Sequence, residues 1–276
     1  MRELRLWLLF AVGLGLVVGV ATDLIELLDP GPLESAARIL IVDNSLHRPI
    51  YRPAQQWMRY VEALPVDVMH APSGDTVESL QDYTHMIITG STASLVDPPA
   101  WADVEADFVR DAADLGLSIL GSCFGHQMLV YALSGPEYVV RAASPEIGWV
   151  GVEMIAFDPL FDGVPSRWHT FAWHSDEVAS LPDPWIVLGH TSRCSAAVIR
   201  FGERAIWGLQ VHPETQPMEA KTLMLLQILS QGRSSPELCS ALLQLPRDDR
   251  VLDVIMERFL LSGVNQDSGL DSGLDL

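Results

Sequence analysis

The stretch "LSILGSCFGHQMLVYAL" (Leu117–Leu133) joins an apolar run to a helical pattern through a turn that holds a cysteine between two glycines. Leu117–Ser122 is typical of a buried strand, and His126–Leu133 has the spacing of a helix. The turn between them fits G-x-C-x-G, the strand–turn–helix context of a nucleophile elbow with Cys in place of Ser. It predicts an α/β fold that displays Cys123 at the carboxyl edge of a sheet.

Glycines on both sides of Cys123 favour this interpretation, because they let the strand and the helix approach without Cβ clashes. The N-terminus of the following helix would favour the thiolate, which is the reactive form of cysteine. The alternative is a small buried cysteine at an ordinary strand–helix junction. The motif alone leaves both open.

Strand and helix patterns alternate through the first half of the chain, which is typical of a parallel sheet covered on both faces. We therefore predict a three-layer sandwich with a mostly parallel central sheet flanked by helices. The expected strands are 38–43, 66–70, 85–90, 117–122, 150–156, 168–173, 186–191, 195–201 and 205–211, and the expected helices are 54–64, 99–115, 126–133, 216–229, 235–243 and 248–262.

The composition restricts the possible partners and cofactors. The 276 residues carry 36 acidic and 17 basic side chains, a net charge of −19, so nucleic acid is a poor candidate partner. Three widely spaced cysteines, Cys123, Cys194 and Cys239, form no CxxC pair, which argues against a disulfide framework or a zinc knuckle. We expect no metal and no cofactor, and a cytoplasmic location.

The N-terminus leaves a membrane-anchored or exported alternative open. Leu6–Ala21 is a run of sixteen uncharged residues, between the length of a signal-peptide core and that of a spanning helix. It could be an anchor, a signal or a wrongly assigned start. We expect three parts: an apolar segment over 1–35, the main domain over 36–231, and a helical extension over 232–276 with an acidic, disordered tail.

A second motif, "WGLQVHPET" (Trp207–Thr215), supplies a candidate base for the cysteine. The motif begins as a strand, and His212 and Glu214 follow at its end. Residues i and i+2 of an extended chain point the same way, so Glu214 can flank the His212 ring while the imidazole faces the thiol. The alternatives are a surface turn or half of a metal site, for which no third ligand is near.

The same chemistry needs donors for a developing oxyanion. The backbone N–H of Phe124, next after the nucleophile, is one natural donor. The loop "ITGSTAS" (Ile88–Ser94) offers a second at Gly90, where a strand ends and small residues follow. The alternative is an ordinary strand–helix turn.

Six short sequence blocks between residues 42 and 214 resemble, in content and in order, those of the class I (triad) glutamine amidotransferases, most closely the stand-alone GMP-synthase-like group. The resemblance covers roughly residues 38–229. One departure is the loop after Gly90, which lacks the consecutive glycines and proline of synthetase-linked members and favours the stand-alone group. The blocks are "VDNS" (42–45), "ITGSTASLVD" (88–97), "SCFGHQ" (122–127), "PEIGW" (145–149), "WHSDEV" (173–178) and "GLQVHPE" (208–214).

The resemblance implies a flavodoxin-like fold and a residue-by-residue assignment of roles. Cys123 would attack the glutamine side-chain amide and form a γ-glutamyl thioester, with His212 as base and then acid and Glu214 as its orienting group. Gly90 and Phe124 would hold the oxyanion, and Gln127 would help to bind the amino-acid end of the substrate. The products would be glutamate and ammonia, the latter passed to a separate synthetase subunit or released.

Two other histidines and two other functions have to be weighed. We interpret His126, on the elbow helix, as structural, and His174, in "WHSDEV", as part of the wall behind the site. The pocket edge is the expected place for "PEIGW". The same triad could instead serve a γ-glutamyl hydrolase or peptidase acting on γ-glutamyl amides. A non-catalytic regulatory module is a lesser alternative, because the Cys-His-Glu set is intact.

Overall fold

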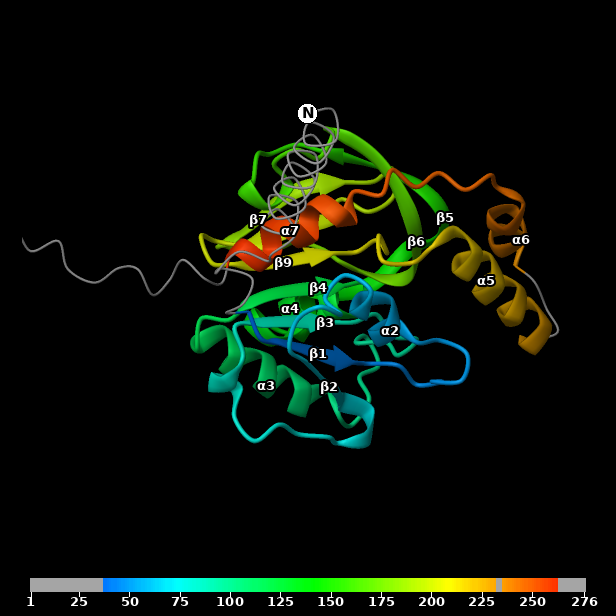
Figure 1. The fold of residues 1–276 in the computed structure, drawn as a ribbon. Helices are drawn as coiled ribbons and strands as arrows, with labels where there is room; N and C mark the ends of the chain where they lie inside the picture. The colour runs from blue at the N-terminus through cyan, green and yellow to red at the C-terminus, as the bar shows by residue number, and fades with distance from the viewer. Residues whose placement is uncertain (1–36, 232–234, 263–276) are drawn as a thin grey trace, which may run out of the picture. The chain divides into compact units, whose positions relative to one another are not determined.

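A computed structural model describes residues 37–231 and 235–262. These residues form a nine-stranded sheet with the strand order β2-β1-β3-β4-β9-β8-β7-β5-β6 (Figure 1). Its first half is parallel: β1 pairs with β2 and β3, β3 with β4, and β4 with β9. These strands are β1 (Ile39–Asp43), β2 (Val66–His70), β3 (His85–Ile88), β4 (Ser118–Ser122) and β9 (Ile206–Leu209).

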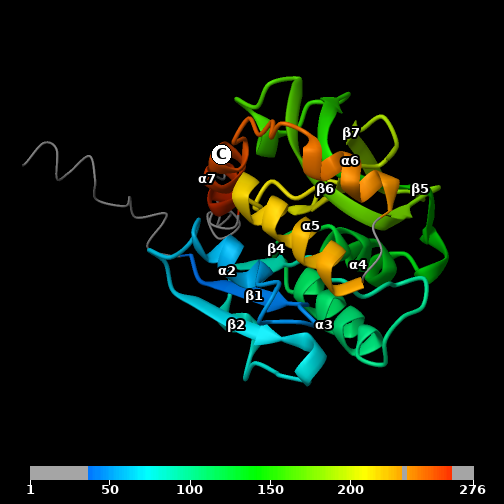
Figure 2. The same cartoon turned by 90° about the vertical axis from the view of Figure 1, so that its right-hand side faces the viewer.

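The central strands are buried on both faces, which explains their nearly unbroken apolar sequences. In β1, Leu40 and Val42 point into one apolar core while Ile39 and Ile41 point into the other, as the two-residue period of a strand requires. The first core lies under α3 (Ala102–Asp114) and α4 (Phe124–Leu133), and the second under α2 (Pro53–Met58) and α7 (Leu252–Ser262). Helices therefore cover both faces of the sheet (Figure 2).

The α/β fold is confirmed, but the prediction of a mostly parallel sheet is wrong. The second half of the sheet is antiparallel, since β8 pairs with β9, β7 with β8, and β5 with both β7 and β6. No α-helix lies between β5 and β9, and parallel neighbours need a long crossover that these short connections do not provide. The strands are β5 (Val139–Met154), β6 (Arg167–Val178), β7 (Trp185–His190) and β8 (Val198–Phe201).

Several elements differ in length from those expected. The helix expected over 54–64 ends at Met58, after which the chain continues through tight turns such as Tyr60 N–H to Trp57 O, 3.0 Å. Strands β5 and β6 are longer than predicted and form an extended antiparallel ribbon. "PEIGW" and "WHSDEV" therefore both lie in these strands.

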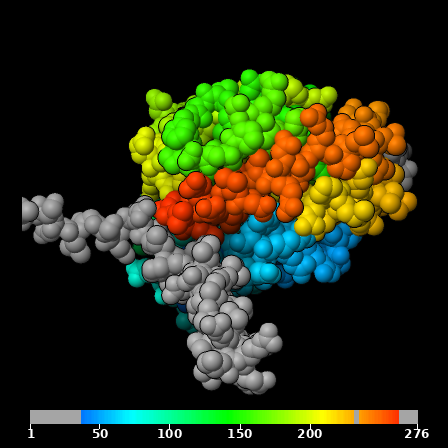
Figure 3. Space-filling view, turned by 45° about the horizontal axis from the view of Figure 1, so that its top comes forward, coloured from blue at the N-terminus to red at the C-terminus, as the bar shows by residue number. Residues whose placement is uncertain are grey.

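The helices expected toward the C-terminus are present as α5 (Pro217–Gln231), α6 (Pro236–Leu243) and α7. Figure 3 shows the chain from α6 to α7 running across the surface between the green strands and the blue start of the fold. In α7, Phe259 is fully buried and its carbonyl oxygen lies 3.0 Å from Nε2 of His85 in β3. The residues after 231 thus supply part of the second core.

Within residues 37–231 and 235–262, no helix is both long enough and apolar enough to cross a membrane. The apolar run Leu6–Ala21 and the acidic tail both lie outside the described residues.

Four loops meet at one edge of the sheet because the strands before them are parallel. The carboxyl ends of β1, β3, β4 and β9 lead into residues 44–52, 89–101, 123 and 210–216. Such an edge is where open α/β sheets bind their ligands.

Candidate active site

Cys123 occupies a strained turn between β4 and α4. Its backbone has φ +50° and ψ −102°, a conformation that a residue with a side chain rarely adopts and that clusters at functional sites. Its N–H donates to the carbonyl of Leu209 in β9, 2.7 Å, which fixes the turn to the neighbouring strand. The thiol donates to the carbonyl of Trp173 in β6, 3.7 Å.

Both flanking glycines are required by close packing around this turn. A Cβ at Gly121 would lie 2.5 Å from the carbonyl carbon and oxygen of Gly125, and a Cβ at Gly125 would lie 2.2 Å from the carbonyl oxygen of Ile88. Real Cβ atoms essentially never come within 3.0 Å of such neighbours. The strand, the elbow and the helix can therefore meet only where these two residues have no side chain.

His212 and Glu214 form a buried pair directly after β9. The N–H of His212 donates to the carbonyl of Phe171 in β6, 2.7 Å, which ties the backbone to the antiparallel half of the sheet. Nδ1 of His212 lies 2.8 Å from Oε1 of Glu214. Because Nδ1 is engaged, Nε2 is the ring nitrogen left for a reacting group.

Ser122 is a fourth member of this arrangement that sequence reasoning missed. Its hydroxyl donates to Oε1 of Glu214, 2.9 Å, and is fully buried. Side chains alternate along a strand, so those of Ser122 and of the next residue, Cys123, point to opposite sides. Cys123 faces the cavity while Ser122 holds the carboxylate behind His212. Alternation along the strand was the only signal in the sequence that could have found it.

The charges around His212 favour its protonated form. Burial opposes the charge, but the Cys123 thiolate and the Glu214 carboxylate together outweigh it and raise the pKa of His212 well above 6.5. The hydrogen bond to Glu214 adds to the effect. The arrangement thus favours the imidazolium form of His212 beside Cys123.

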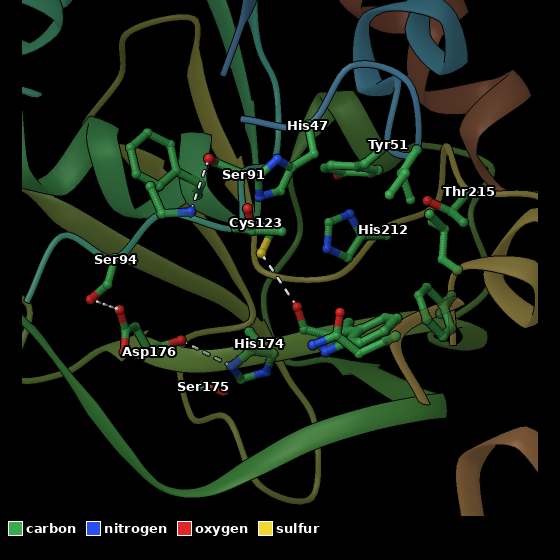
Figure 4. Close-up of a pocket in the computed structure, with 18 of the residues that line it drawn as sticks. His47, Tyr51, Ser91, Ser94, Cys123, His174, Ser175, Asp176, His212 and Thr215 are labelled. Carbon is green, nitrogen blue, oxygen red and sulfur yellow. Dashed lines mark hydrogen bonds between the residues drawn. The ribbon is translucent and has the colours of Figure 1, made fainter. Parts of the chain in front are cut away.

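Cys123 and His212 open into one cavity of 690 Å³ (Figure 4). Ser94, Asp176 and His174 lie on one side of the thiol, whereas His212, Tyr51 and Thr215 lie on the other. We call the first side the polar end. There Asp176 accepts hydrogen bonds from Ser94, 2.5 Å, and from the guanidinium of Arg141, 2.7 Å.

Gln127 is placed beneath the polar end of the cavity, on the first turns of α4. Its side-chain amide donates to the carbonyl of Asp176, 2.9 Å, and to Oε1 of Gln210, 3.1 Å. The residue is 3% exposed and lines the cavity. It connects the elbow helix with β6.

The two residues expected to bind an oxyanion lie beside the catalytic candidates. Phe124 is the first residue of α4 and lines the cavity; N–H groups in a first helical turn have no partner within the helix. Gly90 ends the extended segment after β3, where a Cβ would lie 2.9 Å from Cε1 of His212 and 2.7 Å from the hydroxyl of Tyr51. Its backbone therefore packs directly against the His212 ring.

His126 and His174 occupy the places expected of a structural group and of a residue in the cavity wall. His126 is fully buried against Gly208, and burial lowers its pKa to about 3. Nδ1 of His174 lies 3.0 Å from the carbonyl of Asp176, and Nε2 lies 3.3 Å from Oε2 of Glu146. Glu146, in "PEIGW", also accepts from Thr191. "PEIGW" thus supports the cavity wall from behind.

The remaining cysteines are poor nucleophiles or lie elsewhere. Cys194 is fully buried, and burial raises its pKa to about 12. Cys239 lies on α6 and does not line the cavity. The part of the chain that the structure describes contains no group of three or more His, Cys, Asp or Glu side chains placed to hold a metal ion.

The model of the family described as Glutamine amidotransferase class-I matches residues 40–231. A glutamine-hydrolyzing GMP synthase of Thermosipho africanus is 33% identical over 166 residues, which are 60% of this chain and 30% of that protein. A protein of Methanococcus maripaludis, named as one subunit of a glutamine-hydrolyzing GMP synthase, is 38% identical over 103 residues, 37% of this chain and 53% of that one. The chain therefore spans about a third to a half of these relatives.

Solved structures share the fold at low sequence identity. A glutamine amidotransferase from Thermotoga maritima superimposes with a TM-score of 0.67 at 19% identity, covering 82% of this chain and 98% of that one. One from Methylobacillus flagellatus gives 0.63 at 18% identity, with 82% and 92% covered. These likenesses extend the agreement in fold to most of the described residues.

Proposed function

Because this chain belongs to the class I glutamine amidotransferases, we propose that it hydrolyses the side-chain amide of glutamine through Cys123, His212 and Glu214. The observation that supports this most strongly is the opening of Cys123, in its strained elbow, and of His212, held by Glu214, into one cavity. A buried structural cysteine would need neither the strain nor the paired histidine. We take residues 36–231 as the catalytic domain.

In the first half-reaction, the Cys123 thiolate attacks the amide carbon and the S–C bond forms. The charge moves onto the carbonyl oxygen, where the N–H groups of Gly90 and Phe124 receive it. When the tetrahedral species collapses, the C–N bond breaks and Nε2 of His212 gives its proton to the departing nitrogen. The products of this half are ammonia and a γ-glutamyl thioester on Cys123.

In the second half-reaction, the now neutral His212 accepts a proton from water, whose oxygen attacks the thioester carbon. The C–S bond breaks, glutamate is released, and Cys123 returns to the thiolate paired with the imidazolium. Glu214 keeps Nδ1–H of the ring directed at its carboxylate, which leaves Nε2 facing the reacting atoms.

The polar end of the cavity is our candidate site for the amino-acid end of glutamine. Gln127 and Asp176 line this end, Asp176 with its carboxylate, and Arg141 presents a guanidinium, 52% exposed, beside Asp176. An ammonium group and a carboxylate need groups of these opposite characters. Gln127 also ties Asp176 to the elbow helix, so this end and the nucleophile keep a fixed separation.

The ammonia has a second protein as its proposed destination. Some relatives are named as single subunits of GMP synthase, and by analogy with them we propose that a separate synthetase subunit receives the ammonia from this chain. Without such a subunit, the same reaction would hydrolyse glutamine and release the ammonia into solution.

The proposal is tested by release of glutamate from glutamine by the purified chain, alone and with a candidate synthetase. Cys123→Ala should abolish turnover. Cys239→Ala, which alters a half-buried residue away from the cavity, should leave it unchanged. Equal turnover by Cys123→Ala and the wild type would overturn the assignment.

A further inference from the structure

The cavity is larger than glutamine requires. Its 690 Å³ falls in the range of about 300–1,000 Å³ that holds drug-sized ligands, whereas glutamine has only about ten non-hydrogen atoms. The polar end accounts for the amino-acid group of a substrate, and the thiol for its amide carbon. The space on the His212 side of the thiol is not explained by glutamine.

One wall of that space is a face of α5 whose orientation is fixed by packing. Ala220 and Met224, four residues apart, are fully buried in a cluster with Phe171, so they anchor the helix to the antiparallel half of the sheet. Leu223 and Leu226, three residues apart, lie on the neighbouring face and line the cavity. Leu226 is 37% exposed, so it lies at the mouth of the cavity.

A second part of the lining comes from the loop after β1. Ile50 and Tyr51 both line the cavity, and the hydroxyl of Tyr51 reaches the same point beside Gly90 that Cε1 of His212 does. Burial, and then the charges of Glu214 and Cys123, raise the pKa of Tyr51 well above 10, so its hydroxyl stays neutral. Apart from that hydroxyl, Ile50, Tyr51, Leu223 and Leu226 present hydrocarbon surface.

The orientation of the substrate amide in the proposed reaction directs the leaving group into this space. The nitrogen that departs must face Nε2 of His212 to be protonated, while the γ-glutamyl carbons run toward Gln127 and Asp176. A substituent on that nitrogen would therefore extend away from the polar end, past His212 and Tyr51 (Figure 4), toward the part of the cavity that the loop after β1 and α5 line.

We propose that Ile50, Tyr51, Leu223 and Leu226 form a leaving-group subsite for an apolar amine, and that γ-glutamyl amides of apolar amines are substrates of this enzyme. The inference rests on the proposed function, since it uses the same nucleophile. Burying an apolar substituent there gains about 25 cal/mol per Å² of area removed from water. Ammonia, the leaving group of glutamine, has no such area to bury.

The chemistry is that of the glutamine reaction with one group changed. The Cys123 thiolate forms the S–C bond, the C–N bond breaks, and the amine departs as R–NH₂ with the proton from His212. Water then cleaves the same γ-glutamyl thioester. The products are glutamate and the free amine, and no oxidant or reductant takes part.

A chromogenic amide tests the subsite directly. The kcat/KM values for γ-glutamyl-p-nitroanilide and for glutamine are measured with the wild type, Leu226→Asn and Leu229→Asn. Leu229 is the matched control, because it lies on the same helix, is 68% exposed and does not line the cavity. We expect turnover of the anilide by the wild type, a fall of about tenfold or more in the anilide-to-glutamine ratio for Leu226→Asn, and an unchanged ratio for Leu229→Asn.

The outcomes separate the two proposals. Turnover of glutamine without turnover of the anilide would overturn the subsite and leave the proposed function standing. Equal ratios in Leu226→Asn and the wild type, or equal losses in both variants, would overturn the placement of the subsite. Failure to hydrolyse or form a Cys123 adduct with either amide would overturn the proposed function, and the subsite with it.

Discussion

Nδ1 of His212 lies 2.8 Å from Oε1 of Glu214, and the two residues are separated in the chain only by Pro213. The carboxylate is completely buried, and its Oε1 also accepts from Ser122. An ionised carboxylate in such a place stabilises a positive charge on the neighbouring ring. The contact with Glu214 thus orients the His212 ring and favours its protonated form.

Replacing Glu214 by Gln should move the alkaline limit of activity to lower pH. His212 carries its proton below its folded pKa, which lies well above 6.5, and loses the proton needed by the leaving group as the pH rises through that value. Without the carboxylate the pKa of His212 falls, and so does this limit. We also expect kcat to fall by about 10²-fold or more, measured by glutamate release from neutral to alkaline pH.

Glu203→Gln is the control for this variant, because Glu203 lies in an exposed turn between β8 and β9. It should keep the wild-type pH profile. An unchanged alkaline limit in Glu214→Gln would show that the carboxylate does not set the protonation of His212.

Gly90→Ala should impair catalysis with little effect on folding. The new methyl group would lie 2.9 Å from Cε1 of His212 and 2.7 Å from the Tyr51 hydroxyl, so these side chains must shift at the site. Since small displacements of catalytic groups are costly, we expect kcat to fall by about tenfold or more. The midpoint of thermal unfolding should stay close to that of the wild type. If the variant keeps the kcat of the wild type, the placement of the His212 ring against Gly90 is contradicted.

Gly125→Ala should instead damage the fold. Its Cβ would lie 2.2 Å from the backbone oxygen of Ile88, which cannot rotate away. Overpacking of this kind costs about 1–3 kcal/mol or more, measurable as a lower urea midpoint. Gly151→Ala is the control, because nothing would lie closer than 3.6 Å to its Cβ. Equal stability of the two variants would contradict the close contact at the elbow.

A buried acid in α3 should make stability depend on pH. Glu105 in α3 is 2% exposed, and burial raises its pKa from 4.5 to about 8, although Asn44 donates a hydrogen bond to it at 2.7 Å. The folded protein therefore keeps a proton that the unfolded chain loses, so stability falls as the pH rises from 4.5 to about 8. The loss has an upper limit of about 5 kcal/mol, at 1.36 kcal/mol per pKa unit.

Glu105→Gln should remove this dependence, because a neutral amide can still accept from Asn44. Urea unfolding near pH 5 and near pH 8 measures it, with the wild type losing stability between them and the variant losing less. Parallel losses in both proteins would assign the dependence to other groups.

Local sequence patterns were sufficient to predict the parallel half of the sheet. Apolar, β-branched runs such as Ile39–Asp43 occur where strands are buried on both faces, and Gly121 and Gly125 mark the one place where a strand and a helix crowd together. The resemblance to class I glutamine amidotransferases is confirmed by the family match over 40–231. The assignments to Cys123, His212 and Glu214 remain predictions for the experiments above.

Long-range pairing could not be predicted in the same way. The ribbon of β5 and β6 depends on contacts between segments, and much of its exposed outer face lacks the apolar signal of a buried strand. Ser122 looks like an ordinary strand residue until Glu214 is brought beside it. The cavity face of α5 could not be told from its other apolar faces, because which leucines point inward depends on how Ala220 and Met224 pack.

The most direct test of the central claim is the mass of the peptide containing Cys123 after the protein is mixed with glutamine and quenched in acid. We predict a γ-glutamyl adduct on Cys123 that is absent from Cys123→Ala and is lost with time as glutamate appears. Glutamate release with no adduct on Cys123, or with the adduct on Cys194 or Cys239, would contradict the account.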